Sequence, residues 1–341
     1  MEKRYNAHCE SIFREIDQLD MTASAPLHNQ FTFFSANMEH FMPMVPPSEH
    51  EVYFRGTMYH RRLSRLDLSY AAAGYLPTIV GWDAAWVDSL RQEPAIIACA
   101  HMGAHMLIGM LLAKAGAPLA VLVAEHLVPA LTEIWKTAAR TDPSLRLPLI
   151  VDTGPKTSLR RLMNLAKSGV SLLVYWDGEE HGGKDDRQQA VCVPLLGQHI
   201  VLRRGIPFLA RATGLPIYPL TAFRQQDGSV GVHHGRCIRV EDYRGPDFFR
   251  YTMQAVVDGF SSSLIHFPAQ WNKWTHLHRM VFPEHFFVES GKKLSNRYGI
   301  LQGDDAYFLF ARRDYQAVAL PQKEVDRLCD DAKKRTGNCM L

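Results

Sequence analysis

The chain has 341 residues, which suits one large α/β domain with an appendage. Hydrophobic residues make up 47% of it and charged residues 21%, with a formal net charge of +3, and these values exclude a disordered or strongly charged protein. The slight basic excess, in a sequence without a basic run interleaved with aromatic residues, does not indicate nucleic-acid binding but is compatible with an anionic partner such as an acidic carrier protein or a membrane surface.

The first part of the chain gives the weakest structural signals. We expect residues 1–50 to be irregular with helical stretches, and PMVPP at 43–47 to be a linker. The N-terminal residues have no apolar core and do not predict a signal peptide. Apolar residues then recur at helical spacing over 54–75, and 83–91 predicts a short helix.

From residue 95 the chain alternates short apolar runs with helical patterns. The runs, which predict strands, are AIIACA (95–100), PLAVLVA (118–124), LPLIV (147–151), VSLLVYW (170–176) and IYPLTAF (217–223). The expected helices are 104–115, 128–140, 157–167, 203–213 and 248–266. QDGS at 226–229 predicts a hairpin turn. This order predicts an α/β fold with a mostly parallel or mixed central sheet and helices on both faces.

The C-terminal part has a different pattern. Residues 306–334 predict a hairpin followed by a helix, with Pro321 near the helix start. We therefore expect an N-terminal segment (1–50), an α/β domain (51–282) and a small C-terminal extension (283–341).

The cysteines and the longest apolar stretch indicate the compartment. The six cysteines include no CxxC pair and predict free thiols in a reducing, cytoplasmic environment. The apolar stretch at 94–124 is interrupted by two histidines, a lysine and Pro118, so it does not predict a transmembrane helix.

Two polar residues follow predicted strands. Ligands of open α/β sheets bind beyond the carboxyl ends of the strands, where His101 and Asp177 are expected. A histidine at such a corner can be a general base if a carboxylate holds its second ring nitrogen. Residue 106, a little over one helical turn further on, could supply that carboxylate, but it is Met106.

HMGAHM at 101–106 resembles the motif of the lysophospholipid acyltransferase superfamily, in particular of its late lipid A (lauroyl and myristoyl) acyltransferase branch. In that motif a histidine is followed by four residues and then by Asp or Glu. The segments around it, over 78–282, are similar to the family's blocks in order and spacing. Asp177 matches an acid of the family and Gly197 a glycine. Met106 departs from the motif. The family's hydrophobic anchor helix and an Arg-x-Arg-like stretch before 157 are missing as well.

The resemblance implies an acyltransferase with His101 as general base. It implies an acyl-carrier-protein or coenzyme A thioester as donor, no resident cofactor, and a structural or oxyanion-loop role for Asp177 and Gly197. The missing anchor and acid favour a soluble amine or hydroxyl acceptor for an acyl or aminoacyl group, in specialised-metabolite biosynthesis, because a neutral amine demands less of the base. The expected partners are a carrier protein and a small acceptor, with at most peripheral membrane contact and no nucleic acid.

The candidates for substrate binding are Gly103, His105, Met106, Gly197, Arg203 and Arg204. Gly103 and His105 would line the cleft, with His105 as a pocket wall or a hydrogen-bond partner of His101. Arg203 and Arg204, at a helix start, would bind a phosphate or form a solvated basic face. Of the paired histidines at 233 and 234, at least one should point to solvent. The carboxylates after the strand at 170–176 form a solvated loop, or one of them orients His101 from across the cleft: Asp177, Glu179, Glu180, Asp185 and Asp186.

Three other interpretations stay open. His101 can be a structural histidine, and Met106 can be core packing. A non-catalytic protein could keep the acyl-binding cleft to hold a carrier protein, with Met106 marking the lost chemistry. His101 and His105 could ligate zinc in a hydrolase, although the sequence has no HExxH glutamate and no obvious third ligand, so we expect no metal.

Overall fold

The computed structural model describes residues 1–21, 23–154, 158–178, 190–243, 245–281, 298–303, 306–312, 314–321 and 323–327. The chain forms two compact units, each assembled from three segments. Unit 1 comprises Met1–Phe13, Thr57–Val193 and Leu202–Asn272, and unit 2 comprises Arg14–Gly56, Pro194–Val201 and Lys273–Leu341. The sequence predicted three successive segments, 1–50, 51–282 and 283–341, and these domain boundaries stay a prediction.

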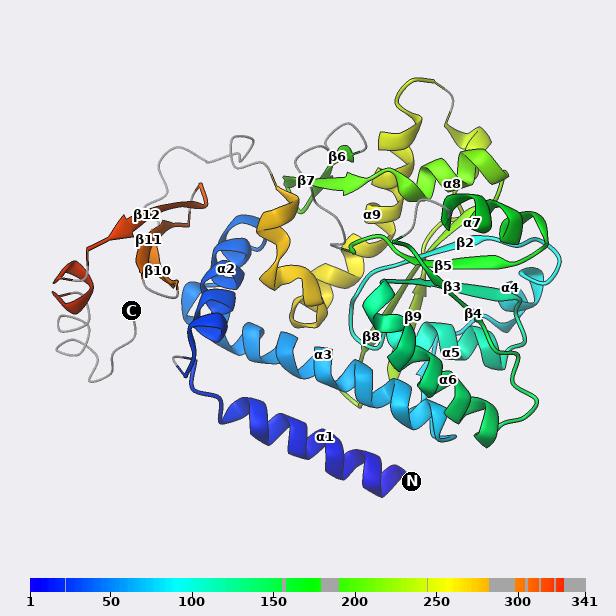
Figure 1. Cartoon of the computed structure of the whole chain (residues 1–341), viewed down its shortest axis with the longest axis horizontal. Coiled ribbons are helices and arrows are strands. Elements are labelled where there is room, and N and C mark those ends of the chain that lie inside the picture. Colours follow the sequence, from blue (N-terminus) through cyan, green and yellow to red (C-terminus); the bar gives the residue numbers. More distant parts are fainter. Residues whose placement is uncertain are drawn as a thin grey trace. The chain divides into compact units, whose positions relative to one another are not determined.

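Unit 1 is built on a seven-stranded sheet with the order β1-β9-β8-β2-β5-β3-β4 (Figure 1). The strands are β1 (Ile79–Val80), β2 (Ile96–Cys99), β3 (Leu119–Val123), β4 (Leu149–Asp152), β5 (Ser171–Tyr175), β8 (Ile217–Arg224) and β9 (Val230–His234). Neighbouring strands are parallel except in the β8–β9 hairpin, which is antiparallel. The predicted α/β class, with a mostly parallel mixed sheet, is confirmed.

Helices cover both faces of this sheet. On one face α3 (His50–Ala72), α4 (Ala84–Ser89), α5 (Met106–Lys114) and α6 (Val128–Thr141) contribute to one hydrophobic core with the strands. On the other, α7 (Ser158–Lys167), α8 (Gly205–Thr213) and α9 (Phe248–His266) pack against β5, β2 and β8 respectively (Figure 1). The nine-residue α5 is apolar except for its last residue and is almost wholly buried, which identifies it as a core helix.

Register places two loops side by side at the carboxyl edge of the sheet. Cys99 of β2 is the register partner of Tyr175 of β5. His101 and Asp177 each follow these partners by two residues. Because parallel strands end at the same edge, both side chains emerge from neighbouring strand ends.

The N-terminal segment, expected to be irregular with helical stretches, is mostly helical. Residues Glu2–Asp17 form α1 and Ala25–Phe41 form α2. Ser24 caps α2 by accepting a hydrogen bond from the Leu27 N–H, and a proline stands in the first turn. Several residues of α2, including Phe34, Met38 and Phe41, are fully buried, so the helix lacks the single apolar stripe that marks a surface helix.

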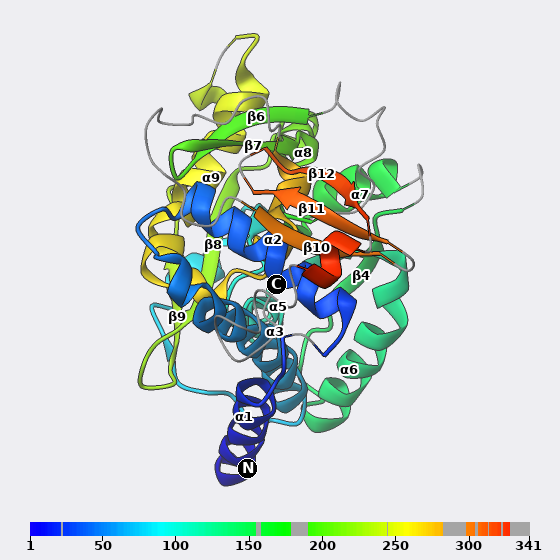
Figure 2. The same cartoon turned by 90° about the vertical axis from the view of Figure 1, so that its left-hand side faces the viewer.

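Unit 2 contains α2 and a three-stranded antiparallel sheet of β10 (Tyr298–Gln302), β11 (Tyr307–Ala311) and β12 (Gln316–Leu320). The predicted C-terminal hairpin is β11–β12, and β10 adds a strand that the sequence did not indicate. α2 lies along β10 (Figure 2), where the His28 ring nitrogen Nε2 is 3.0 Å from the Ile300 carbonyl oxygen. Residues 323–327 of the predicted helix are helical. Elsewhere, β6 (Ala190–Leu195) and β7 (Gln198–Arg203) form a two-stranded sheet.

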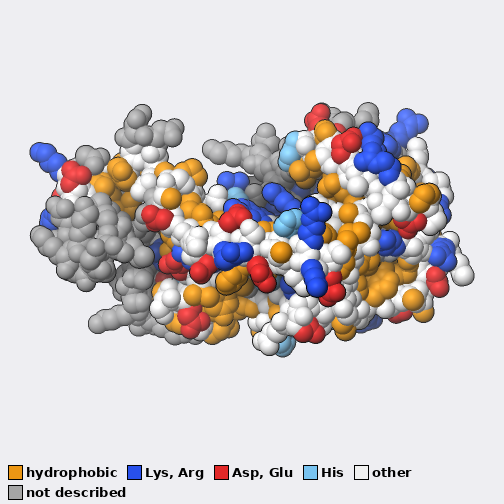
Figure 3. Space-filling view, turned by 90° about the horizontal axis from the view of Figure 1, so that it is seen from below, with side chains coloured by type: hydrophobic (Ala, Val, Ile, Leu, Met, Phe, Trp, Pro, Cys, Tyr) orange, Lys and Arg blue, Asp and Glu red, His pale blue; other side chains and the backbone are white. Residues whose placement is uncertain are grey.

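The prediction of free cysteines is confirmed where the cysteines can be described. Cys9, Cys99, Cys192 and Cys237 are free thiols, and the other two cysteines lie outside the described residues. No helix in the described part of the chain combines the length and apolar character needed to cross a membrane. On the face in Figure 3, basic and acidic side chains are interspersed.

Candidate active site

His101 and Asp177 form a hydrogen-bonded pair. The His101 ring nitrogen Nδ1 is 2.7 Å from the Asp177 oxygen Oδ1, and the backbone N–H of His101 donates to Oδ2 at 3.0 Å. The Asp177 side chain has no exposed surface, whereas that of His101 is 28% exposed. Because an ionised carboxylate only accepts hydrogen bonds, Nδ1 carries the proton and Nε2 keeps its lone pair. The pair is therefore arranged as a base with its orienting acid.

Trp271 holds the same carboxylate from the other side. Its indole Nε1–H donates to Asp177 Oδ2 at 2.8 Å, and the residue is fully buried. The indole packs at 5.3 Å between ring centres from Phe260 of α9. A carboxylate with N–H donors on both oxygens is held in position.

The backbone around Trp271 clamps the loop that carries His101. Residues 270–272 run antiparallel to 101–103, with Met102 and Trp271 as bridge partners. The Asn272 N–H donates to the His101 carbonyl at 2.9 Å, and the Gly103 N–H donates to the Gln270 carbonyl at 2.9 Å. The loop after β2 is thus fixed by backbone hydrogen bonds.

A glycine is required at position 103, because the loop that carries His101 lies very close to Gln270 and Ala222 there. It has φ +49°, in the left-handed region. A Cβ at this position would lie 2.6 Å from the Gln270 Oε1 and 2.7 Å from the Ala222 carbonyl oxygen. The sequence predicted Gly103 as a substrate-binding residue, and the contacts show it packed between two backbone segments.

Aromatic rings surround the His101 imidazole. The Tyr175 ring lies 4.5 Å from it, tilted by 30°, and the His105 ring lies 5.1 Å from it, edge to face. The Tyr175 hydroxyl donates to the His105 carbonyl at 3.0 Å. The buried His105 ring nitrogen Nδ1 is 3.2 Å from the Ser64 Oγ of α3. His105 thus forms part of the wall around His101.

The Met106 side chain packs in the core and does not orient the His101 imidazole. Its side chain contacts the hydrophobic core of unit 1, and its N–H donates to Ser64 Oγ at 3.3 Å. The position at which the resemblance implies an acid is therefore occupied by a methionine that begins α5 and packs against the core. The carboxylate that meets His101 comes instead from the neighbouring strand, through Asp177.

Two other ionisable groups beside the pair, the Cys99 thiol and the Tyr175 hydroxyl, have raised pKa values. Burial, and then the charge of Asp177, raise the pKa of the Cys99 thiol well above its ordinary value. Burial likewise raises the pKa of the Tyr175 hydroxyl, ahead of smaller contributions from Cys99 and Asp177. A protonated thiol is a poor nucleophile, so the partly exposed imidazole of His101 is the reactive group that the geometry offers.

The remaining predicted residues lie in other elements or outside the described residues. Gly197 belongs to unit 2, in the turn between β6 and β7 with φ +80°. Arg203 ends β7, and Arg204 precedes α8 with its guanidinium 5.3 Å from the centre of the Phe249 ring. Glu179, Glu180, Asp185 and Asp186 lie outside the described residues.

The histidine pair of β9 is partly exposed. His233 and His234 are both half-buried, and the expectation that at least one of them points to solvent stays a prediction. His234 packs against Trp86 with ring centres 4.7 Å apart, and burial lowers its pKa.

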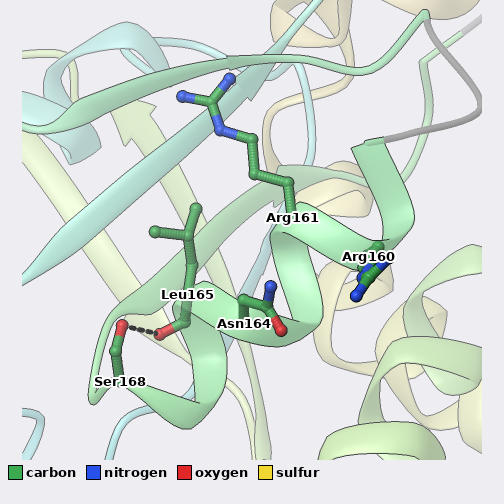
Figure 4. Close-up of a pocket in the computed structure, with 5 residues that line it drawn as sticks. All are labelled: Arg160, Arg161, Asn164, Leu165 and Ser168. Atoms are coloured by element: carbon green, nitrogen blue, oxygen red, sulfur yellow. Dashed lines mark hydrogen bonds between the residues drawn. The ribbon is translucent and has the colours of Figure 1, made fainter.

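A separate groove of about 520 Å³ lies on α7 and is lined by Arg160, Arg161, Asn164, Leu165 and Ser168 (Figure 4). The Ser168 hydroxyl donates to the Leu165 carbonyl at 2.8 Å. Both arginines are exposed, and the residues that line the groove do not include the His101 cluster.

Sequence reasoning missed three members of the cluster: Ser64, Tyr175 and Trp271. Tyr175 ends a predicted strand, and Trp271 lies in a segment similar to the block that closes the family's domain. Neither position carries a signal for the hydrogen bond it makes, because the partners are distant in sequence.

No protein-family model and no curated protein sequence matches the chain. Within the described ranges, no group of three or more His, Cys, Asp or Glu is arranged to hold a metal ion.

Proposed function

We propose that the protein is an acyltransferase that moves an acyl or aminoacyl group from a thioester to an amine or hydroxyl acceptor. The observation that carries the proposal is the 2.7 Å contact between the partly exposed His101 and the fully buried Asp177. The resemblance to the lysophospholipid acyltransferase superfamily supports the choice of reaction.

In the proposed reaction Nε2 of His101 takes a proton from the acceptor as its nitrogen or oxygen attacks the thioester carbonyl. A C–N or C–O bond forms, the tetrahedral intermediate collapses, and the C–S bond breaks. The proton then passes from Nε2 to the departing thiolate. Asp177 keeps the imidazole in the reactive tautomer and stabilises the imidazolium that forms between the two steps.

The donor is proposed to be a carrier-protein or coenzyme A thioester, so the phosphopantetheine arm arrives with the substrate. The replacement of the motif acid by Met106 does not remove the orienting carboxylate, because Asp177 already occupies Nδ1 of His101. This contact argues against the non-catalytic alternative, which rested on the loss of that acid.

Mass spectrometry of acyl thioesters tests the proposal. The protein is incubated with carrier-protein and coenzyme A thioesters and with panels of amine and hydroxyl acceptors. We expect product with the wild-type protein and with His126→Ala, an exposed control histidine, and a loss of at least about a thousandfold with His101→Ala. Full activity in a folded His101→Ala variant would refute the role of His101. Thioester binding without consumption would favour a carrier-binding protein.

A further inference from the structure

Tyr175 is held in place at both of its ends. Its backbone pairs with β2, where Cys99 is its register partner, and the N–H of Trp176 donates to the Cys99 carbonyl at 3.0 Å. At the tip of the side chain, the hydroxyl donates to the His105 carbonyl at 3.0 Å. Burial raises the pKa of this hydroxyl, so it stays protonated near neutral pH and keeps its role as a donor. The phenol ring is therefore anchored by its backbone and by its hydroxyl.

The face of this ring lies against the imidazole of His101. The two ring centres are 4.5 Å apart, and the ring planes are tilted by 30° from one another. The His105 ring approaches the same imidazole with its edge, at 5.1 Å and an angle of 66°. Tyr175 thus presents its π face to His101, within the distance of about 6 Å at which an aromatic ring attracts a cation.

The ring face and the Asp177 carboxylate act on different parts of the imidazole. Asp177 Oδ1 accepts a hydrogen bond from Nδ1 at 2.7 Å and fixes one edge of the ring. The Tyr175 face lies across the plane of the ring and limits its rotation. An imidazole held along one edge and across one face has a defined orientation.

The proposed reaction places a positive charge on His101 beside this face. An apolar neighbour removes water from an imidazolium and disfavours it, whereas the partial negative charge of an aromatic face offsets that loss. Other titratable groups lie beside the imidazole: Asp177, His105 and the buried Cys99. The Tyr175 ring therefore adds to the stabilisation that the Asp177 carboxylate gives to the protonated histidine.

We propose that Tyr175 is a positioning residue for His101, whose ring face orients the imidazole and stabilises the imidazolium. This role rests on the proposed function, in which His101 gains and returns a proton in each turnover. If the ring served packing alone, any side chain of the same shape would replace it. The proposed role requires an electron-rich ring.

An NMR titration of the His101 ring tests this role without any substrate. The ring signals are assigned by their absence from His101→Ala, and the pH of half-protonation is compared among variants. Tyr175→Phe keeps the ring face and should keep this pH at the wild-type value. Tyr175→Leu should lower it by about 0.5 unit, which corresponds to the loss of one cation–π contact. Tyr251→Leu, at an exposed tyrosine of α9, should leave it unchanged.

Pentafluorophenylalanine at position 175 separates charge from packing. It keeps the shape of phenylalanine, but fluorine withdraws electron density from the ring face and weakens its attraction for a cation. We expect the half-protonation pH of this protein to fall as it does in Tyr175→Leu. A value equal to that of Tyr175→Phe would show that the ring only packs, and would overturn the proposal.

The transfer assay gives a second readout. Tyr175→Leu should lower kcat about two- to fivefold with KM unchanged, and Tyr175→Phe should restore it. A lowered half-protonation pH in a protein that transfers nothing would support the role of Tyr175 and count against the acyltransferase reaction alone. Wild-type kcat and an unshifted titration in Tyr175→Leu would reject the role of Tyr175 and leave the acyltransferase proposal standing.

Discussion

Replacing Asp177 by Asn tests the proposed dyad most directly. Both carboxylate oxygens accept N–H donors, Oδ1 from His101 Nδ1 and Oδ2 from the Trp271 indole. An amide has only one oxygen, so its NH₂ must face one of these donors. If it faces His101, the imidazole has to adopt the other tautomer, and Nε2 loses the lone pair that makes it a base.

The size of the effect follows from which donor loses its acceptor. The wrong imidazole tautomer lowers turnover by about 10⁴-fold in dyads and triads, or about 5 kcal/mol of barrier. If the NH₂ instead faces Trp271, the buried indole N–H is left without an acceptor, which costs about 1–3 kcal/mol of stability. We therefore expect Asp177→Asn to lose about 10³- to 10⁴-fold in kcat, or to be destabilised by that amount, or both.

The measurements are single-turnover thioester consumption and denaturant unfolding, with Asp258→Asn, at an exposed carboxylate of α9, as the matched control. Asp258→Asn should match the wild type in both. If Asp177→Asn turns over within threefold of the wild type and unfolds at the same denaturant concentration, the carboxylate does not orient the imidazole, and the reasoning fails.

Three further predictions concern packing and pH. Trp271→Phe should lower kcat about tenfold or more by removing the indole donor to Asp177, and an unchanged kcat would show that the donor is dispensable. Gly103→Ala should lower the free energy of unfolding by about 2–4 kcal/mol, because the added Cβ meets backbone at φ +49°; a melting temperature equal to that of the wild type would contradict the clamp. Burial lowers the pKa of His50 from 6.5 to about 4, so the unfolded chain binds its proton first and stability should fall from pH 6.5 to 4. Denaturant titrations at pH 7 and 4.5 should show a smaller fall in His50→Gln, and an equal fall would exclude His50 as a source.

The sequence predicts the central sheet well because each buried parallel strand is a continuous apolar run between helical patterns. The expected run at 95–100 contains β2, and α9 has the predicted bounds. Apolar periodicity does not reveal α2, because its residues are buried on several sides and give no periodic stripe. It also misses β10, whose residues 298–302 contain a glycine and have a weak alternating pattern.

Trp271 shows why the rest of the site could not be predicted. Its indole reaches a carboxylate 94 residues earlier in the chain, and its backbone pairs with the loop after β2. Tryptophan in a polar loop is equally compatible with packing, so its type does not indicate a hydrogen bond to a buried acid. Only the three-dimensional path of residues 270–272 brings the donor to Asp177.

The acid that supports His101 illustrates the difference between a linear motif and a strand register. A motif of the form histidine, four residues, acid places both groups on one helix turn, so a single substitution such as Met106 appears to destroy it. The register of β2 and β5 also places an acid beside the histidine. Cys99 and Tyr175 are register partners, and His101 and Asp177, two positions beyond them, lie side by side. The sequence leaves that adjacency as one alternative among several, since β3 and β4 intervene between β2 and β5 along the chain. A substitution at position 106 therefore need not remove the chemistry, and the test of lost function lies at position 177.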